Sequence, residues 1–169
     1  FIDEGGFLSS MDQPAEVSVL EQGPLFVKVA VKGKIGKYSF TQTIRLTQGE
    51  PRIDMSVKLD WIGSPRIGEP GIEFRADNPR KAFYDDRYKL LVYLPTQIAN
   101  QQIYKDAPFD VCESRLENTF FNRWDSIKHN IILNWVDVAS KDNSCGLSLF
   151  TDHTTSYAHG KDFPLALNV

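Results

Sequence analysis

Cysteine is scarce in this sequence, since only Cys112 and Cys145 occur among 169 residues. Two cysteines are too few for a disulfide-stapled scaffold or a cysteine-based zinc site. We therefore expect buried free thiols, with one bridge between them left open if the protein is exported. The chain also lacks any apolar run near the ~20 residues that span a bilayer, so we expect no membrane segment and no membrane partner.

An excess of positive charge is lacking as well. The chain has 19 Lys and Arg residues against 22 Asp and Glu residues, which gives a net charge of −3, and its basic residues are scattered. Proteins that bind nucleic acid concentrate positive charge in a patch or stripe. We therefore expect no nucleic-acid partner.

Common catalytic signatures are absent: the sequence has no G-x-S-x-G elbow, P-loop, Rossmann glycine fingerprint or C-x-x-C pair. It also lacks an initiator methionine and a signal peptide, opening with FIDEGGFLSS and stopping in the apolar run FPLALNV. We expect residues 1–169 to form a single domain excised from a longer polypeptide. The compartment stays open, with export to a bacterial periplasm as one option.

The clearest pattern that is present is alternation of apolar and polar residues. In RIDMSVKLDWI, residues 52–62, every second side chain from Ile53 to Trp61 is apolar, which predicts a strand with one buried face. Residues 37–47 and 25–32 repeat the pattern, and short turns with glycine separate the three segments. The sequence predicts a three-stranded antiparallel meander over residues 24–62.

The rest of the chain predicts further strands and one long connection. Residues 63–87 are rich in glycine and proline and predict an irregular excursion, whereas residues 96–106 come nearest to a helical pattern but are polar. About eight strands in all, many with one solvated face, predict an all-β fold, an antiparallel β-sandwich of two sheets. The strands expected after the excursion cover residues 88–95, 109–115, 130–139, 145–151 and 165–169.

One short stretch, TDHTTSYAHG at residues 151–160, concentrates polar groups that could serve a site: Asp152, His153, Tyr157 and His159. The two histidines are six residues apart, which does not fit the i, i+4 spacing of a zinc-binding helix. We interpret residues 152–160 as a loop after a strand. Loop ends of sandwiches host binding sites, but such side chains also bond to their own backbone, and both interpretations stay open.

Two other positions are weaker candidates. Asp85 and Asp86 are neighbours, so on a strand they point to opposite faces and cannot be the paired carboxyls of a glycosidase; pairing with Arg87 in a solvated loop is the structural alternative. Trp124 has polar neighbours and is a candidate for stacking on sugar, whereas we expect Trp61 and Trp135 in the core.

Three segments together resemble a known family. These are VLEQGPLFVKVAVKGKIGKYSFTQTIRLTQGEPRIDMSVKLDW (19–61), LNWVDV (133–138) and CGLSLFTDHTTSYAHGKDFPLAL (145–167). In this order they resemble the C-terminal β-sandwich region of glycoside hydrolase family 38 α-mannosidases, and the TDHTTSY form is most similar to bacterial members. Residues 64–108 match poorly.

The resemblance implies a galactose-mutarotase-like supersandwich and a parent enzyme that removes α-linked mannose with retention. The family's Asp nucleophile and its zinc ion belong to an N-terminal α/β catalytic domain whose motifs this chain lacks, so no catalytic or metal-binding residue is assigned here. The expected partners are that catalytic domain and mannose-containing glycans. Candidates for the pocket rim or an inter-domain contact are Asp152, His153, Tyr157 and His159, with Trp124, Asp86 and Arg87 as weaker sugar contacts.

Three functions follow from this interpretation. The leading one is a non-catalytic domain that packs on the catalytic domain and helps shape the mannose pocket, in which case the fragment alone exposes an apolar patch. The second is a free-standing carbohydrate-binding module with an aromatic platform. The third is a sugar epimerase related to mutarotases, which would need a paired His and Glu.

Overall fold

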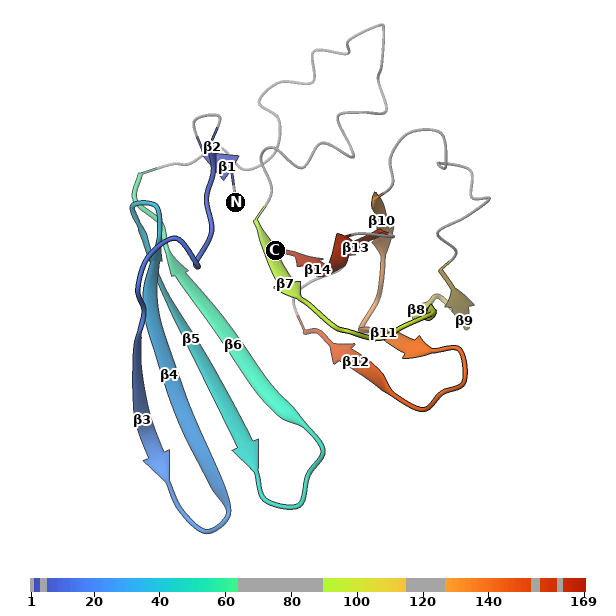
Figure 1. Ribbon diagram of the computed structural model, residues 1–169, viewed down its shortest axis with the longest axis horizontal. Coiled ribbons are helices and arrows are strands. Elements are labelled where there is room, and N and C mark those ends of the chain that lie inside the picture. The colour runs from blue at the N-terminus through green and yellow to red at the C-terminus, as the bar shows by residue number, and fades with distance from the viewer. Residues whose placement is uncertain (1, 4–5, 64–89, 115–126, 153–155, 161–162) are drawn as a thin grey trace, which may run out of the picture. The chain divides into compact units, whose positions relative to one another are not determined.

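The computed structural model describes residues 2–3, 6–63, 90–114, 127–152, 156–160 and 163–169. The chain divides into two compact units, Phe1–Pro70 and Gly71–Val169. All regular structure in the described residues is β, and every strand pair is antiparallel, which confirms the predicted all-β fold (Figure 1). That residues 1–169 form a single domain stays a prediction.

The first unit is built around one sheet of long neighbouring strands in the order β3-β4-β5-β6 (Figure 1). It contains the predicted three-stranded meander, which is confirmed, and adds β3 as a fourth strand that the sequence pattern did not indicate. A short pair, β1 and β2, precedes it. The bounds are β1 Ile2–Asp3, β2 Gly6–Phe7, β3 Glu16–Gln22, β4 Phe26–Ile35, β5 Tyr38–Thr47 and β6 Ile53–Asp60.

The register of this sheet places its apolar residues on one face. Val29 lies opposite Ile44, which in turn lies opposite Met55, so the alternating apolar positions of adjacent strands fall on the same side. The expected burial of that face is wrong for β6, because Ile53 is 64% exposed and Val57 is 48% exposed. The alternating pattern shows which face of a strand is apolar. That face is buried only if a second layer covers it, and the pattern of one strand does not reveal such a layer.

One end of this sheet has a small core of its own. Tyr38 is 1% exposed and meets Trp61 edge-to-face, with ring centroids 5.1 Å apart. Trp61 stays 38% exposed, so its predicted place in the core is wrong. The ring of Phe40 covers Gly33 on the neighbouring strand. Gly36, with φ +58°, makes the tight turn from β4 to β5.

The second unit contains two four-stranded antiparallel sheets. One has the strand order β10-β13-β14-β7 and the other β12-β11-β8-β9. We call them the C sheet and the D sheet. The strand bounds are β7 Leu91–Leu94, β8 Gln101–Ala107, β9 Asp110–Glu113, β10 Ile127–Ile131, β11 Trp135–Ser140, β12 Gly146–Phe150, β13 Ser156–Gly160 and β14 Phe163–Asn168.

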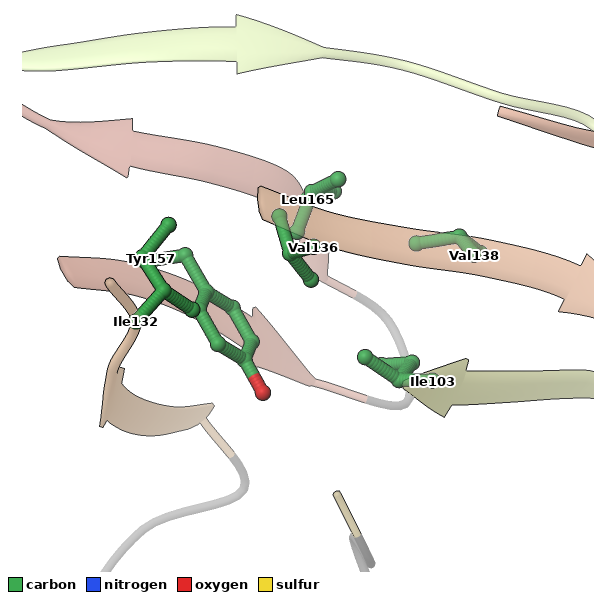
Figure 2. Close-up of a cluster of buried hydrophobic side chains, with 6 residues drawn as sticks. All are labelled: Ile103, Ile132, Val136, Val138, Tyr157 and Leu165. Atoms are coloured by element: carbon green, nitrogen blue, oxygen red, sulfur yellow. The ribbon is translucent and has the colours of Figure 1, made fainter. Parts of the chain in front are cut away.

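Side chains from both sheets meet in one core, shown in Figure 2. Tyr157 and Leu165 come from the C sheet, whereas Ile103, Val136 and Val138 come from the D sheet, and each of the five is at most 2% exposed. Ile132, from the connection between β10 and β11, completes the cluster. Two sheets packed through their apolar faces are the predicted sandwich arrangement.

Two sequence-based boundaries are wrong in this unit, and one strand was not predicted. Residues 130–139 do not form one strand, because β10 and β11 belong to different sheets and the chain breaks between them. Residues 152–160 are not all loop, since β13 begins at Ser156. The polar residues 96–106 contain most of β8. The long excursion expected over residues 63–87 lies outside the described residues from 64 onward.

Both cysteines are free. Cys112 on β9 is half-buried, but Cys145, just before β12, is exposed, so the expectation of burial is wrong for Cys145. Within the part of the chain that the structure describes, no helix is long and apolar enough to cross a membrane.

Candidate functional site

The sequence candidates in residues 151–160 separate into different environments. Tyr157 and His159 are two residues apart on β13, so both point to the same face of the strand, and they are 0% and 3% exposed. Asp152 is exposed beyond the end of β12. His153, like Trp124, Asp86 and Arg87, lies outside the described residues.

His159 links the two sheets of the second unit. Its Nε2 lies 2.7 Å from Oε1 of Gln101 on β8. Because an amide oxygen only accepts hydrogen bonds, this contact assigns the proton to Nε2. Nδ1 is buried and has no hydrogen-bond partner among the described residues. Burial lowers the pKa of His159, which keeps the ring neutral. His159 therefore has a structural role, since it packs in the interior and forms a hydrogen bond with Gln101.

Tyr157 lies two residues before His159 on β13 and belongs to the buried cluster. Its ring belongs to the same buried cluster as Ile132 and Val136 (Figure 2). Burial raises the pKa of Tyr157 to about 12, and the nearby side chain of Ser114 partly offsets this. Ser114 does not reach hydrogen-bond geometry, so the Tyr157 hydroxyl is buried and unpaired among the described residues. Such a phenol is held protonated and is a poor base.

Asp106 organises the break between β10 and β11. Its Oδ1 accepts hydrogen bonds from the backbone N–H groups of Leu133 at 2.9 Å and Trp135 at 3.2 Å. Its Oδ2 accepts from Asn134 twice, from the backbone at 2.7 Å and from the side-chain amide at 3.0 Å. Desolvation raises the pKa of Asp106, but these hydrogen bonds together outweigh it and hold the pKa below the ordinary value.

Lys105, the residue before Asp106, makes a second connection between the sheets. Its Nζ donates to the backbone oxygen of Ile131 at the end of β10, at 2.9 Å. Desolvation lowers the pKa of Lys105, and the neighbouring Cys112 and Asp106 oppose that shift. Gln101, Lys105 and Asp106 could not be foreseen from the sequence, because their partners lie 26 to 58 residues away and no local pattern marks them.

The hairpin between β11 and β12 carries another polar cluster. Asp142 accepts hydrogen bonds from the Ser140 hydroxyl at 2.6 Å and from the backbone and hydroxyl of Ser144. The Ser140 contact, followed by the Ser144 contacts, lowers the pKa of Asp142 to about 2. All these contacts lie within one turn in which Asn143 has φ +56°. The cluster shapes the turn and leaves no oriented acid or base for chemistry.

The described residues form one notable hollow but no ligand set for a metal. An open hollow of about 420 Å³ lies at one end of the first sheet and is lined by residues 22–27 and 46–48, none of which is ionisable. No group of three or more His, Cys, Asp or Glu side chains in the described ranges is placed to hold a metal ion. The groups that are best positioned here therefore stabilise the sandwich.

Comparison with protein families gives the decisive observation. The family model for the glycosyl hydrolases family 38 C-terminal domain matches residues 5–167. The chain belongs to this family. Membership implies linkage to an N-terminal catalytic domain in a glycoside hydrolase. The resemblance that the sequence motifs indicated is thus confirmed at the level of the family, whereas a bacterial type stays a prediction. No curated protein and no solved structure matches the chain.

Proposed function

We propose that this family 38 domain is the non-catalytic β-sandwich of a zinc-dependent retaining α-mannosidase. It packs on the catalytic domain and helps to shape the mannose pocket, where mannose-containing glycans meet its rim. The observation that carries the proposal is the family match over residues 5–167, nearly the whole chain. A galactose-mutarotase-like supersandwich is the fold expected to perform this role.

The chemistry of the described side chains favours a non-catalytic role for this domain. A retaining glycosidase uses two carboxyl groups about 5 Å apart, one as nucleophile and one as acid and base. Asp106 has both oxygens occupied by backbone and amide donors, and Asp142 is bonded within its own turn. The described residues do not fit a zinc site either. We therefore assign zinc and the reacting carboxyls to the catalytic domain.

Among the rim candidates, Asp152 is the accessible one in the described residues. It follows β12 of the D sheet, and the chain then enters β13 of the C sheet at Ser156. Tyr157 and His159 anchor β13 from the interior, through core packing and the contact with Gln101. In this proposal Asp152 contacts the rim, whereas Tyr157 and His159 are positioning residues that hold the strand behind it.

The proposal is tested with the full-length polypeptide that carries this chain. We expect turnover of an aryl α-mannoside, with NMR showing the α-anomer as the first product and with activity lost on zinc chelation and restored by zinc. Asp152→Asn should raise KM several-fold with little change in kcat, because a rim contact acts on binding. An inverted product, or a glycoside other than α-mannoside as the preferred substrate, would contradict the assignment.

A further inference from the structure

Strand β6, Ile53–Asp60, forms one edge of the first sheet. Among the described strands it is hydrogen-bonded to β5 alone, at the end of the order β3-β4-β5-β6 (Figure 1). Alternate backbone groups of an edge strand point away from its sheet, so the outer side of β6 presents N–H and C=O groups to a further strand. The pairing with β5 continues from Ile53 to Asp60 without a register shift, so this edge is regular over its whole length.

The opposite edge of the same sheet is interrupted. Strand β3 pairs with β4 through a register shift between Val19 and Glu21. Bulges of this kind twist an edge and make it a poor template for another strand. By contrast, β6 has neither a register shift nor a proline within its bounds. Of the two edges, β6 is therefore the one suited to pairing with a further strand.

One face of β6 carries a row of charges that alternate in sign. The members of the row are two residues apart along the strand and share a face, apart from the gap that a serine fills at the centre. They are Arg52, Asp54, Ser56, Lys58 and Asp60. Ion pairs along the strand join Arg52 to Asp54 at 3.0 Å and Lys58 to Asp60 at 3.2 Å. The four charged side chains are 45% to 78% exposed, so they can reach a strand beside them.

This row of charges is complementary to itself when its direction is reversed. In an antiparallel pairing of β6 with β6 of a second copy, Ser56 can lie opposite Ser56 on the two-fold axis. Arg52 then faces Asp60 of the second copy, and Asp54 faces Lys58 of the second copy. The two-fold symmetry makes each of these contacts occur twice. All four cross-strand contacts therefore join opposite charges, which stabilises the pairing.

Neighbouring registers lack this match. Sliding one strand by one residue places the polar face opposite the apolar face. Sliding it by two residues brings Arg52 opposite Lys58 in one direction and Asp54 opposite Asp60 in the other, and like charges that face each other are destabilising. A row that served only to repel other strands would carry charges of one sign. The alternation in sign therefore specifies one partner strand and one register.

The apolar face of β6 matches in the same register. Ile53 lies opposite Leu59 of the second copy, and Met55 lies opposite Val57 of the second copy. In a single copy Ile53, Met55 and Val57 are exposed. Cross-strand contacts between such side chains add to the stability of a strand pair. Both faces of β6 thus favour the pairing that the charges specify.

We propose that β6 pairs with β6 of a second copy of this chain in this two-fold register. The pairing joins two four-stranded sheets into one continuous sheet. An interface of one strand from each copy is small, so the dimer should dissociate on dilution. Salt screens exposed charges, so the dimer should also weaken as ionic strength rises. The proposal does not depend on the α-mannosidase assignment.

Charge reversal on the edge tests the register in the full-length polypeptide that carries this chain. One variant combines Asp54→Lys with Asp60→Lys and makes the row positive, and the other combines Arg52→Glu with Lys58→Glu and makes it negative. In sedimentation velocity at low salt, each variant alone should self-associate at least about ten-fold more weakly than wild type, because all four contacts become repulsive. An equimolar mixture should associate as wild type does, because every contact again joins opposite charges.

Three outcomes of this experiment overturn the proposal. They are a wild-type protein that stays monomeric at all concentrations, a variant that dimerises alone as well as wild type, and a mixture of the two folded variants that does not associate. A monomeric wild type would mean that another segment of the same polypeptide covers the edge.

Crosslinking provides a second measurement with a milder substitution. Ser56→Cys, in a background with Cys112→Ser and Cys145→Ser, should be joined by a short thiol-reactive crosslinker to position 56 of a second copy, as identified by mass spectrometry. Ser39→Cys is the matched control, because Ser39 is also exposed and lies opposite Asp60 on the same face, but on the interior strand β5. It should give no such crosslink. Equal crosslinking of both variants, or none for Ser56→Cys, overturns the proposal.

Discussion

At the scale of single residues, the buried ionisable groups of this chain work for the fold. Asp106, His159 and Lys105 each bond to atoms that lie far away in the sequence but next to them in space. Asp106 and His159 are buried and Lys105 is half-buried, and each is paired in the folded state, so its protonation is coupled to stability. This coupling gives two predictions.

Asp106→Asn should lower the free energy of unfolding by about 2 kcal/mol at neutral pH, because an amide offers one acceptor where the carboxylate offers two. The folded-state pKa of Asp106 is lowered, so its contribution is present above the unfolded value of about 3.9 and is lost as pH falls through the folded value. In urea denaturation at a series of pH values, the free energy of unfolding should therefore fall less steeply with decreasing pH for the variant than for the wild type. Asp60→Asn, at an exposed ion pair with Lys58, is the control and should change little.

His159 should destabilise the protein in mild acid. Burial lowers its folded-state pKa, so the unfolded chain binds a proton more readily, and the free energy of unfolding falls as pH drops below the usual histidine value of about 6.5. His159→Gln should lack this fall. Urea midpoints measured at a series of pH values for both proteins isolate the effect, because the other two histidines are common to both. Parallel profiles would show that His159 does not titrate with unfolding.

At the scale of elements, the long alternating strands could be predicted, and the short strands β7, β9, β12 and β14 also fall at or within predicted segments, whereas β8, β10 and β13 could not be predicted correctly. The segments that became β4, β5 and β6 alternate over eight or more residues, and the predicted meander is confirmed. By contrast, β8, β10 and β13 are five to seven residues long and are mixed in composition. Their bounds depend on long-range partners such as Asp106 and Gln101, which no local pattern reveals.

Register in the first sheet depends on a close contact that can be tested. A Cβ on Gly33 would lie 2.7 Å from Cε1 of the buried Phe40 ring on the neighbouring strand. Gly33→Ala should therefore lower the free energy of unfolding by about 1–3 kcal/mol through overpacking. Gly23→Ala is the matched control, since no atom lies within 4 Å of its Cβ. Chemical denaturation of both variants checks this, and equal effects would contradict the close packing.

At the scale of the whole molecule, the sequence could give the family but not a catalytic site. Motifs at both ends of the chain indicated family 38, and the match over residues 5–167 confirms it. From the sequence, the candidate site could be predicted only as a cluster of polar residues within residues 151–160. Residue type cannot show that Tyr157 and His159 point into the core while Asp152 stays exposed, because that depends on where β13 begins.

The central claim is that this domain supports catalysis without supplying the reacting groups. Its most direct test is to divide the full-length polypeptide into a catalytic part and this chain and to measure aryl α-mannoside turnover by each part and by the mixture. We predict that this chain alone is inactive, that the catalytic part alone retains less than about a tenth of the full activity, and that mixing restores most of it. Turnover by this chain alone, or full activity of the catalytic part without it, would contradict the claim.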